Sequence, residues 1–516
     1  MHRATIRVDA SHVIGSGHVI RCLTLAEVLR ERAVQVSFIC RELDGNLCDL
    51  IESRGFPVTR LPLDEYADVG AAPPEHAAWL RSSWQTDAAQ TRSAIEASGG
   101  TDWLVIDHYA LDWRWEEALG ALAGEIVVID DLADRNHRCR TLLDQNLVDG
   151  MADRYEARVP PATGLLLGPR YALLQPLYAR LHAEATARKG PVSRLLVYFG
   201  GSDLNDLTGR TLAAFRRLNR TDIEVDLVIA NGSPHMASIC RQTDGLGNVH
   251  IHQGLPSLAE IMARADIAIG AGGATVWERL CLGLPSLVVT IAENQRSIAE
   301  ELHRRALIRY LGHHDTVDVS DLERVLADVL GRDSDEQWSQ RCLAVVDGAG
   351  AARVAAVLTA DPDTPLRVRP ADESDESLLL EWANDRLTRR NAFFPEPISA
   401  STHRAWFRVR VADPGRCRMY IVETGEAVPV GTVRFEHSIE GWEVHFSLAP
   451  SFRGRGLGRK LLQSAMRALR TDTIRPDLIF GQVRAENIAS RRIFEGLCFE
   501  GPTDARDGVV VYRRAK

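Results

Sequence analysis

The sequence of 516 residues lacks the features that mark membrane, secreted and nucleic-acid-binding proteins. No run approaches the roughly 18 consecutive apolar residues of a membrane span. The first predicted strand begins near Thr5, so we expect no signal peptide. The net charge is -9 and the pI about 6.0, whereas a nucleic-acid-binding surface requires excess positive charge. These absences predict a cytoplasmic protein that binds neither membranes nor nucleic acids.

Cysteine is sparse and follows no recognisable pattern. The nine cysteines are scattered from Cys22 to Cys498, and none forms a C-x-x-C pair. An odd number makes a poor disulfide framework, and no zinc-ligand spacing stands out. We therefore expect reduced, buried thiols and no metal. Apolar residues make up 45% and charged residues 25%, which are ordinary globular values.

Strands and helices alternate through the first two-thirds of the chain. Short apolar strands are predicted at 6–10, 34–40, 103–106, 125–129, 195–199, 225–229, 267–269 and 286–289, and amphipathic helices at 18–32, 257–265 and 294–304. This alternation indicates parallel sheets covered on both faces. It restarts near Arg194, after a helix and linker within 171–191. We therefore predict two doubly wound domains, residues 1–175 and 176–358, with the ligand in the cleft between them.

A change of pattern marks a third domain. Residues 359–366 have the composition of a linker. Beyond them the pattern becomes α+β, with a strand at 366–369, a helix at 373–384 and antiparallel-type strands at 419–423, 430–437 and 442–448. A Gly/Arg loop and a helix at 457–470 follow. Residues 367–516 are predicted to form this domain.

A glycine turn in the first domain delivers a histidine to the start of a helix. The strand at 6–10 runs into Gly15-Ser16-Gly17-His18, and glycines let a ligand approach the backbone closely. The helix dipole favours a neutral imidazole, which suits a general base that activates water. A capping or packing role for His18 is about equally supported. Asp107, His108 and Tyr109 end another strand and are expected to bind substrate or orient His18, with loop capping as the alternative for Asp107.

Three loops of the second domain are predicted to hold a nucleotide. A glycine-rich turn at 270–275 follows a strand and opens a helix, whose first N–H groups suit a diphosphate. A carboxylate one turn later suits ribose hydroxyls, and two adjacent amides suit a sugar. A glycine-rich turn alone is a weak signal, because many α/β proteins carry one for packing. The predicted contacts are Gly201, Ser202, Gly272, Gly273, Thr275, Glu278, Asn294 and Gln295.

Taken in order, these motifs resemble the UDP-sugar hydrolases of pseudaminic-acid biosynthesis, a family that itself resembles GT-B glycosyltransferases. The resemblance runs from Ile6 to about Arg305 and rests on D-A-S-x-x-I-G-x-G-H-x-x-R, D-H-Y at 107–109, D-D-L-A at 130–133, L-D-Q-N at 143–146 and G-G-x-T-x-W-E … L-G-L-P … A-x-N-Q. One departure is Arg140 after Cys139, where aspartate is expected. The resemblance implies metal-free hydrolysis of UDP-2,4-diacetamido-2,4,6-trideoxy-β-L-altrose. The implied catalytic residues are His18, Asp107 and Tyr109, and the implied substrate contacts in this domain are Asp9, Gly15, Gly17, Arg21 and His108.

The loop before the last predicted helix contains R-x-x-G-x-G, from Arg453 to Gly458. Its N–H groups and arginines would surround a pyrophosphate. A dinucleotide-binding fold is disfavoured, because the flanking strands do not look parallel and no βαβ unit is expected to follow.

Together with N-x-x-S-x-x-x-F-E from Asn487 to Glu495, this loop resembles the GNAT acetyltransferases. Segments at 381–389 and 403–407 resemble the branch acting on 4-amino nucleotide sugars. The resemblance implies acetyl-CoA contacts at Leu448, Arg453, Arg455, Gly456, Leu457, Gly458, Arg459, Asn487 and Ser490.

Two departures from the GNAT pattern affect the expected chemistry. Phe494 stands where many members have a tyrosine acid, and Cys498 stands where they have glycine. The base is open between Glu443 and His445, and both are also compatible with a solvated strand face.

The combined expectation is a fold of GT-B-like doubly wound domains followed by a GNAT domain, with UDP-sugar and acetyl-CoA as its small-molecule partners. The function expected is 4-N-acetylation of a UDP-amino sugar and removal of UDP. Three alternatives stay open: a glycosyltransferase with an acceptor in place of water, acetylation of another amino sugar such as a legionaminic precursor, and one module reduced to nucleotide binding.

Overall fold

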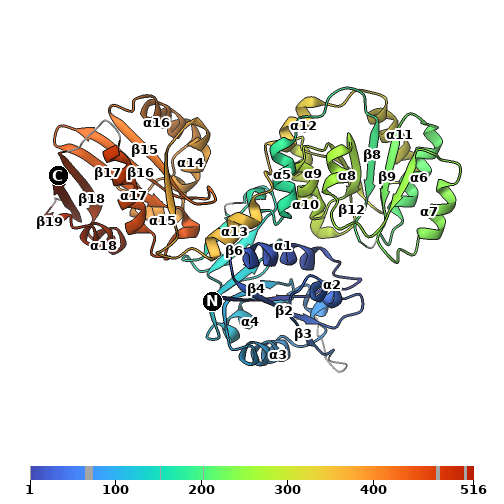
Figure 1. Ribbon diagram of the computed structural model, residues 1–516, viewed down its shortest axis with the longest axis horizontal. Helices are drawn as coiled ribbons and strands as arrows, with labels where there is room; N and C mark the ends of the chain where they lie inside the picture. Colours follow the sequence, from blue (N-terminus) through green and yellow to red (C-terminus); the bar gives the residue numbers. More distant parts are fainter. Residues whose placement is uncertain are drawn as a thin grey trace. The chain divides into compact units, whose positions relative to one another are not determined.

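The computed structural model describes residues 2–63, 74–151, 153–201, 203–471, 477–504 and 508–515. It divides into two compact units, residues 1–355 and 356–516, each described here by itself (Figure 1). The first unit holds two wholly parallel sheets and the second a single mixed sheet. The predicted fold class, two doubly wound domains followed by an α+β domain, is confirmed. The boundary between the first two domains at 175/176 stays a prediction.

The first sheet has seven parallel strands in the order β3-β2-β1-β4-β5-β6-β7. Their bounds are β1 Arg3–Val8, β2 Gln35–Arg41, β3 Val58–Leu61, β4 Thr101–Asp107, β5 Ala123–Ile129, β6 Thr141–Asp144 and β7 Gly164–Leu167. The helices between them are α1 Gly17–Glu31, α2 Cys48–Ser53, α3 Trp84–Ala97 and α4 Trp113–Leu119, with a short 3-10 helix, η1, at Ala77–Leu80. Because β1 and β4 are neighbours, the loops after them meet at one edge of the sheet.

The second sheet has six parallel strands in the order β10-β9-β8-β11-β12-β13. Their bounds are β8 Arg194–Tyr198, β9 Glu224–Val228, β10 Val249–His252, β11 Ile267–Ala271, β12 Ser286–Thr290 and β13 Arg309–His313. The helices are α5 Pro176–Glu184, α6 Leu207–Leu218, α7 Met236–Thr243, α8 Ala259–Arg264, α9 Thr275–Cys281, α10 Arg296–Arg304, α11 Val319–Leu330, α12 Glu336–Leu343 and α13 Gly350–Leu358. Residues 171–175, predicted as part of a helix, precede α5.

The central strands of this second sheet are buried on both faces, and successive side chains belong to different hydrophobic clusters. Leu195 and Val197 of β8 belong to the hydrophobic cluster on one face, and Leu196 to the cluster on the other. Successive side chains of a strand point to opposite faces, so an apolar run is buried on both sides only when helices cover both faces. This is the arrangement that the run of apolar residues predicts.

The third sheet runs β14-β15-β16-β17-β18-β20-β19. Its strands are β14 Leu366–Pro370, β15 Cys417–Thr424, β16 Pro429–Ser438, β17 Gly441–Leu448, β18 Leu478–Arg484, β19 Glu500–Asp504 and β20 Val509–Ala515. Its helices are α14 Glu376–Asn384, α15 Arg386–Asn391, α16 Ala400–Ala412, α17 Gly458–Thr471 and α18 Ile488–Gly496.

One expectation about this sheet is wrong. The strands flanking the Gly/Arg loop were expected not to be parallel and to form no βαβ unit, yet β17, α17 and β18 form one. Trp442 pairs with Ile479 and Glu443 with Phe480, whereas no pairing continues from residue 444 to 448. The other neighbouring strand pairs of this sheet are antiparallel. Their alternating apolar and polar residues gave no sign that one pair of strands is parallel. The two strands therefore separate toward their carboxyl ends.

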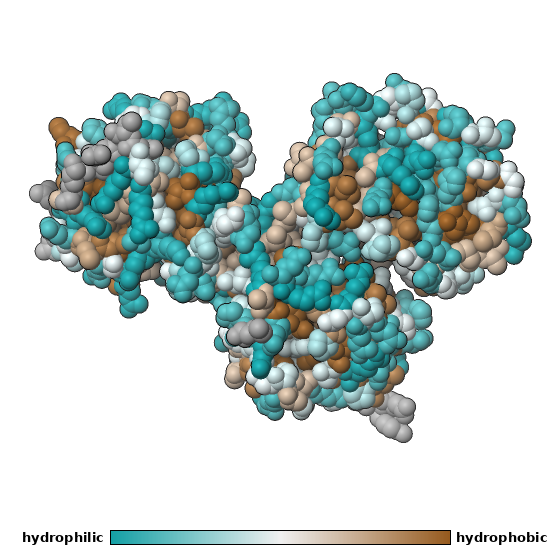
Figure 2. Space-filling view, viewed as in Figure 1, coloured by the Kyte–Doolittle hydropathy of each residue, from teal (hydrophilic) through white to brown (hydrophobic). Residues whose placement is uncertain are grey.

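The surface is mixed in character. In the view of Figure 2, hydrophilic residues spread over both units, with smaller hydrophobic areas between them. Within the described residues, no helix combines the length and apolar character needed to span a bilayer.

Candidate functional site

His18 lies on the first turn of α1 and contacts a buried carboxylate. Its Nδ1 is 2.6 Å from Oδ1 of Asp107, the last residue of β4. The His18 side chain is 10% exposed and that of Asp107 is fully buried. When Nδ1 carries the proton and donates it to Asp107, Nε2 is left as the nitrogen that can accept a proton from water.

An arginine keeps Asp107 ionised. Arg21, one turn beyond His18 on α1, places Nε 2.6 Å from Oδ2 and Nη2 2.6 Å from Oδ1 of Asp107. Burial alone would raise the pKa of the Asp107 carboxyl, but Arg21 and then His18 outweigh it and hold the pKa well below its usual range. Asp107 therefore orients the imidazole as a fixed acceptor, and Arg21 belongs to the same constellation.

Tyr109 contacts the imidazole through its ring and Asp131 through its hydroxyl. The rings of Tyr109 and His18 meet edge to face, with centroids 4.6 Å apart. The hydroxyl donates to Oδ2 of Asp131 at 2.5 Å, and burial followed by Asp131 raises the pKa of the phenol. Tyr109 therefore stays protonated and holds the position of His18 rather than exchanging a proton at neutral pH.

Asp131 is a residue for which the sequence motifs predicted no role. It also accepts from Nη1 of Arg21 at 2.7 Å and from Nδ2 of Asn146 at 2.7 Å. Its position after β5, next to β4 in the sheet, brings it to the edge where His18 lies. Because Arg21, Tyr109 and Asn146 all donate to the Asp131 carboxylate, this residue links the segments that follow β4, β5 and β6 beside the imidazole.

Asp9, predicted to contact substrate, lies in a buried charge network. Arg7 contacts its Oδ1 at 2.6 Å and its Oδ2 at 2.9 Å, and the backbone N–H of Arg41 donates to Oδ1 at 2.7 Å. Arg7 and Arg41 both bind Asp87, at 2.6 and 2.7 Å. The side chains of Arg7, Asp9, Arg41 and Asp87 are fully buried. Asp9 thus has little surface left for a ligand, and its contact with substrate stays a prediction.

His108 is buried against Asp9, whereas the predicted contacts Gly15 and Gly17 have open space around them. The Nε2 of His108 lies 3.2 Å from Oδ2 of Asp9, and burial lowers the pKa of this histidine. In contrast, a Cβ added at Gly15 or Gly17 would meet no atom within 4 Å. Gly15 has φ 81°, a left-handed conformation that favours glycine. The turn in front of His18 therefore has open space on it, as a ligand-binding turn requires.

The predicted nucleotide contacts of the second domain lie on loops after neighbouring strands. Gly201 follows β8 and Gly272 follows β11, its partner in the sheet. Gln295 accepts from the N–H of Ile291 at 3.0 Å, and its side chain lies against Gly272. Gly273 lies on the loop after β11, Thr275 is the first residue of α9, and Asn294 lies in a short 3-10 helix after β12. Ser202 falls outside the described residues. Thr290 at the end of β12, not predicted, lies against Gly272 as well.

Glu278 has the electrostatics of a ligand-binding carboxyl. Burial raises its pKa to about 7, although a hydrogen bond from Tyr178 acts in the opposite direction. Its Oε2 is buried and has no hydrogen-bond partner within the part of the chain that the structure describes. A buried oxygen without a partner is unfavourable, and ribose hydroxyls would supply donors.

In the second unit, two of the predicted phosphate-binding arginines are engaged by the protein. Arg453 donates to Oδ1 of Asp385 at 2.5 Å and to Oγ1 of Thr388 at 2.7 Å. The buried Arg455 donates to the carbonyl oxygens of Leu358 and Ser451, at 3.1 and 3.4 Å. These contacts shape the loop, and direct binding of a pyrophosphate by either guanidinium stays a prediction.

Two glycines of this loop have left-handed conformations. Gly454 and Gly456 have φ 73° and 76°, and Gly456 packs closely against Pro362. Binding of a pyrophosphate by the N–H groups of this loop stays a prediction. Leu457 and Gly458 lead into α17, and Arg459 is exposed beside Gly496. Asn487 caps α18 by accepting from the N–H of Ser490 at 3.1 Å. Leu448 ends β17 where β17 and β18 separate.

A polar cluster occupies the half-buried face of β16 and β17. The Nε2 of His445 lies 3.9 Å from Glu436 and 3.8 Å from Glu443, and it has no hydrogen-bond partner within the described ranges. Burial and then Arg434 lower the pKa of His445 to about 4. Burial and then Glu436 raise the pKa of Glu443. The pair therefore offers two proton acceptors of different strength.

Two family models match this chain. Residues 195–347 match "Glycosyltransferase family 28 C-terminal domain", and residues 366–500 match "Acetyltransferase (GNAT) domain". The chain joins a GT-B-like pair of domains to a GNAT-type domain.

Relatives are similar over different extents. An uncharacterised protein of Methanocaldococcus jannaschii is 21% identical over 99% of each chain. The spore coat polysaccharide biosynthesis protein SpsG of Bacillus subtilis is 28% identical, over 38% of this chain and 58% of that protein. The crystal structure of MurG from Acinetobacter baumannii covers 69% of this chain and 99% of that chain, at 13% identity and a TM-score of 0.46.

The GNAT-type domain shows why its two departures from the resemblance matter. Phe494 is buried and stacks on Tyr512, with centroids 5.2 Å apart, so this position offers no acid. Cys498 has φ 58°, the left-handed conformation for which glycine is favoured. The backbone therefore keeps the conformation that a glycine would adopt, at the expense of some strain.

One group in the GT-B-like pair has the spacing of metal ligands. Glu75, His76 and Asp134 each offer an atom within 4.8 Å of the others, in a search of the described residues. Asp134 is already bound by Arg135 at 2.8 Å, and Glu75 is exposed. This donor set is incomplete as a metal site, and the expectation of metal-free chemistry stays a prediction.

Proposed function

We propose that the GT-B-like pair hydrolyses a UDP-activated amino sugar, specifically UDP-2,4-diacetamido-2,4,6-trideoxy-β-L-altrose. The observation that carries this proposal is the contact of His18 with Asp107, itself held ionised by Arg21. An oriented imidazole beside an open glycine turn is suited to activating a water molecule. The motifs shared with the pseudaminic-acid hydrolases supply the identity of the sugar.

The reaction divides between the two domains. The Nε2 of His18 takes a proton from water as the oxygen attacks the anomeric carbon, and the bond from that carbon to the diphosphate breaks. UDP leaves with the electron pair of that bond. Backbone N–H groups near Gly272 and Gly273 and the hydroxyl of Thr275 would stabilise its negative charge. Glu278 would accept from the ribose hydroxyls.

We further propose that the GNAT-type domain acetylates the 4-amino group of the UDP-sugar precursor. Acetyl-CoA, as cosubstrate, supplies the acetyl group as a thioester. The loop from Arg453 to Arg459 would hold its pyrophosphate, and the N–H at Leu448 would bind the acetyl oxygen. The amine attacks the thioester carbon, CoA leaves as thiolate, and Glu443 or His445 takes the amine proton. The protonated base or water then supplies a proton to the thiolate.

The two activities fit one pathway. In pseudaminic-acid biosynthesis, 4-N-acetylation comes directly before removal of UDP, so one chain would carry consecutive steps. A tether raises the local concentration of the intermediate.

A second candidate function is glycosyl transfer to an acceptor instead of water. The match of residues 195–347 to a glycosyltransferase model favours it. The acetyltransferase would then serve another amino sugar, such as a legionaminic precursor. Incubation with the UDP-sugar alone separates the candidates, because only a hydrolase releases free sugar at a substantial rate without an acceptor.

The deciding experiment is incubation of the full chain with UDP-4-amino-4,6-dideoxy-N-acetyl-β-L-altrosamine, with and without acetyl-CoA, followed by mass spectrometry. We expect a mass increase of one acetyl group only with acetyl-CoA, and then UDP and the free diacetamido sugar. Acetylation without sugar release would refute the hydrolase assignment. Release without acetylation would refute the acetyltransferase assignment.

A further inference from the structure

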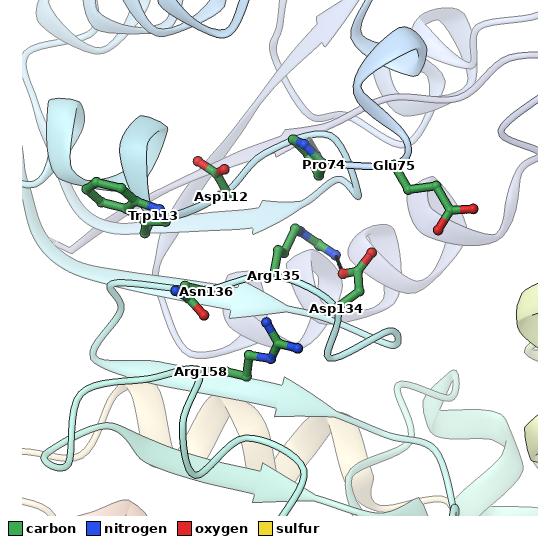
Figure 3. A pocket seen from close by; sticks show the side chains of 8 residues that line it. All are labelled: Pro74, Glu75, Asp112, Trp113, Asp134, Arg135, Asn136 and Arg158. Carbon is green, nitrogen blue, oxygen red and sulfur yellow. Dashed lines mark hydrogen bonds and ion pairs between the residues drawn. The ribbon is translucent and has the colours of Figure 1, made fainter. Parts of the chain in front are cut away.

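A cavity of about 350 Å³ lies in the first domain and is not used by the proposed reaction. It is formed by loops that follow β4 and β5, by the residues before η1 and by the segment before β7 (Figure 3). Its lining residues are Pro74, Glu75, Asp112, Trp113, Asp134, Arg135, Asn136 and Arg158. Because two of these loops follow β4 and β5, the cavity is at the same sheet edge as His18.

A single aromatic ring connects the cavity wall to the imidazole. The guanidinium of Arg135 lies 5.6 Å from the ring centroid of Tyr109, and that ring is 4.6 Å from the ring of His18. His76, adjacent to Glu75, also contacts Tyr109, with centroids 5.4 Å apart. A ligand in the cavity would therefore be a close neighbour of the hydrolytic site.

Three of the eight lining residues, Asp112, Asp134 and Arg135, are committed to the fold. Asp112 caps α4 and binds Arg114 at 2.7 Å, and Arg135 binds the carbonyl oxygen of Leu111 at 2.8 Å and Asp134 at 2.8 Å. In Figure 3 the contact drawn among the lining residues joins Arg135 to Asp134. These groups fix the wall and are not available to a ligand without losing their partners.

The other polar side chains of the wall are uncommitted. Glu75, Asn136 and Arg158 show no side-chain hydrogen bond or ion pair among the residues that the structure describes. The carboxylate of Glu75 points away from the other lining residues in Figure 3, which leaves Asn136 and Arg158 for a ligand. Trp113 is 41% exposed, which is unusual for an indole. The cavity thus offers one flat apolar surface, one guanidinium and one amide.

This combination selects among classes of ligand. Three carboxylates against two guanidiniums disfavour a phosphate, and the charged groups disfavour an apolar molecule. A hydroxyl-rich ring needs both donors and acceptors, and its C–H face can pack on an indole. The volume lies at the small end of the range of about 300–1,000 Å³ for ligand pockets, which suits one sugar ring.

We propose that this cavity binds a single pyranose, with Trp113 against its C–H face and Arg158 and Asn136 on its hydroxyls. The sugar has two sources with the same chemistry: the sugar released from UDP, or the sugar of an acceptor. The choice of sugars to test rests on the proposed function, whereas the cavity and its lining do not.

The test is saturation-transfer NMR of the full chain with two probes and no nucleotide sugar. One probe is free 2,4-diacetamido-2,4,6-trideoxy-L-altrose, and the other is methyl N-acetyl-β-glucosaminide, whose blocked anomeric carbon mimics an acceptor glycoside. Trp113→Ala and Arg158→Ala should each weaken binding about tenfold, as expected for loss of a packing surface or a charged hydrogen bond. Arg138→Ala, an exposed arginine of the same domain, is the matched control. Affinity for UDP and far-UV circular dichroism should be unchanged in all three.

Each outcome decides the proposal. Binding of the altrose sugar alone, sensitive to Trp113→Ala and Arg158→Ala, identifies a product site. Binding of the methyl glycoside with the same sensitivity identifies an acceptor site. Absence of transfer to both probes, or binding that neither variant weakens, overturns the proposal. Failure of UDP-sugar hydrolysis is a separate result, because binding is measured without turnover.

Discussion

Replacement of His18 by asparagine separates the roles of the two imidazole nitrogens. The asparagine amide N–H can take over donation to Asp107, which His18 makes through Nδ1 at 2.6 Å. The variant has nothing at the position of Nε2. His18→Asn therefore removes the proposed base and keeps the contact that orients it.

The structure supports an estimate of both effects. General base catalysis contributes about 10²–10⁴-fold, or about 2.7–5.4 kcal/mol of transition-state stabilisation. A hydrogen bond to a charged partner contributes about 1.5–3 kcal/mol to stability. His18→Asn should therefore lower turnover by about 10²–10⁴-fold with nearly unchanged stability. His18→Ala should lose that activity and also destabilise the domain by about 1.5–3 kcal/mol.

The assay is the initial rate of free-sugar release from the diacetamido UDP-altrose, with UDP affinity measured by calorimetry on the same preparations. His12→Asn is the matched control, because this histidine is in the same domain with its side chain 70% exposed. UDP affinity should stay within about twofold in all variants. Turnover of His18→Asn within tenfold of the unmodified chain would show that the imidazole is not the base.

Three further predictions concern other groups. Because the pKa of the Glu278 carboxyl is raised to about 7, this group is mostly ionised above pH 7. UDP affinity should therefore fall as the pH is lowered, by about tenfold per pH unit well below pH 7. In calorimetry, Glu278→Gln should remove this part of the pH dependence, and an unaltered profile would contradict the ribose contact. Chelation by EDTA should leave sugar release within twofold, since Asp134 of the Glu75 group is already bound by Arg135. A loss of activity that Mg²⁺ restores would refute metal-free hydrolysis. The pKa of His445 near 4 makes this histidine a weak base, whereas the pKa of Glu443 is raised. Glu443→Gln should therefore slow acetyl transfer about 10²–10⁴-fold and His445→Gln much less, with CoA affinity unchanged in both. The reverse order of effects would assign the base to His445.

In the second sheet, the central strands could be predicted because they are apolar on both faces, and the two edge strands could not. β10, with the sequence VHIH, and β13, with RYLGH, are the two edges of the second sheet and carry polar side chains. β6 is buried throughout but has only four residues, too few to distinguish from a loop by pattern. In the third sheet, the parallel pairing of β17 with β18 could not be predicted from the sequence, because the other neighbours of these two strands are antiparallel.

The candidate site was predictable where one short segment carries it and less so where the fold assembles it. His18 and the glycines before it are contiguous, and strand ends predicted that Asp107 would be near. Arg21 and Asp131 lie 110 positions apart in the sequence, and only the fold shows that they share a hydrogen bond. The motif also could not show that Arg453 and Arg455 bind groups of the protein itself. The same R-x-x-G-x-G sequence is compatible with guanidiniums that bind a ligand and with guanidiniums that bind protein atoms.

The four charges enclosed within the first domain constrain how this chain can vary. Arg7 and Arg41 balance Asp9 and Asp87 where water does not reach, so loss of any one leaves an uncompensated charge, at about 3–5 kcal/mol. A lineage can alter one of these positions only together with a second of opposite sign.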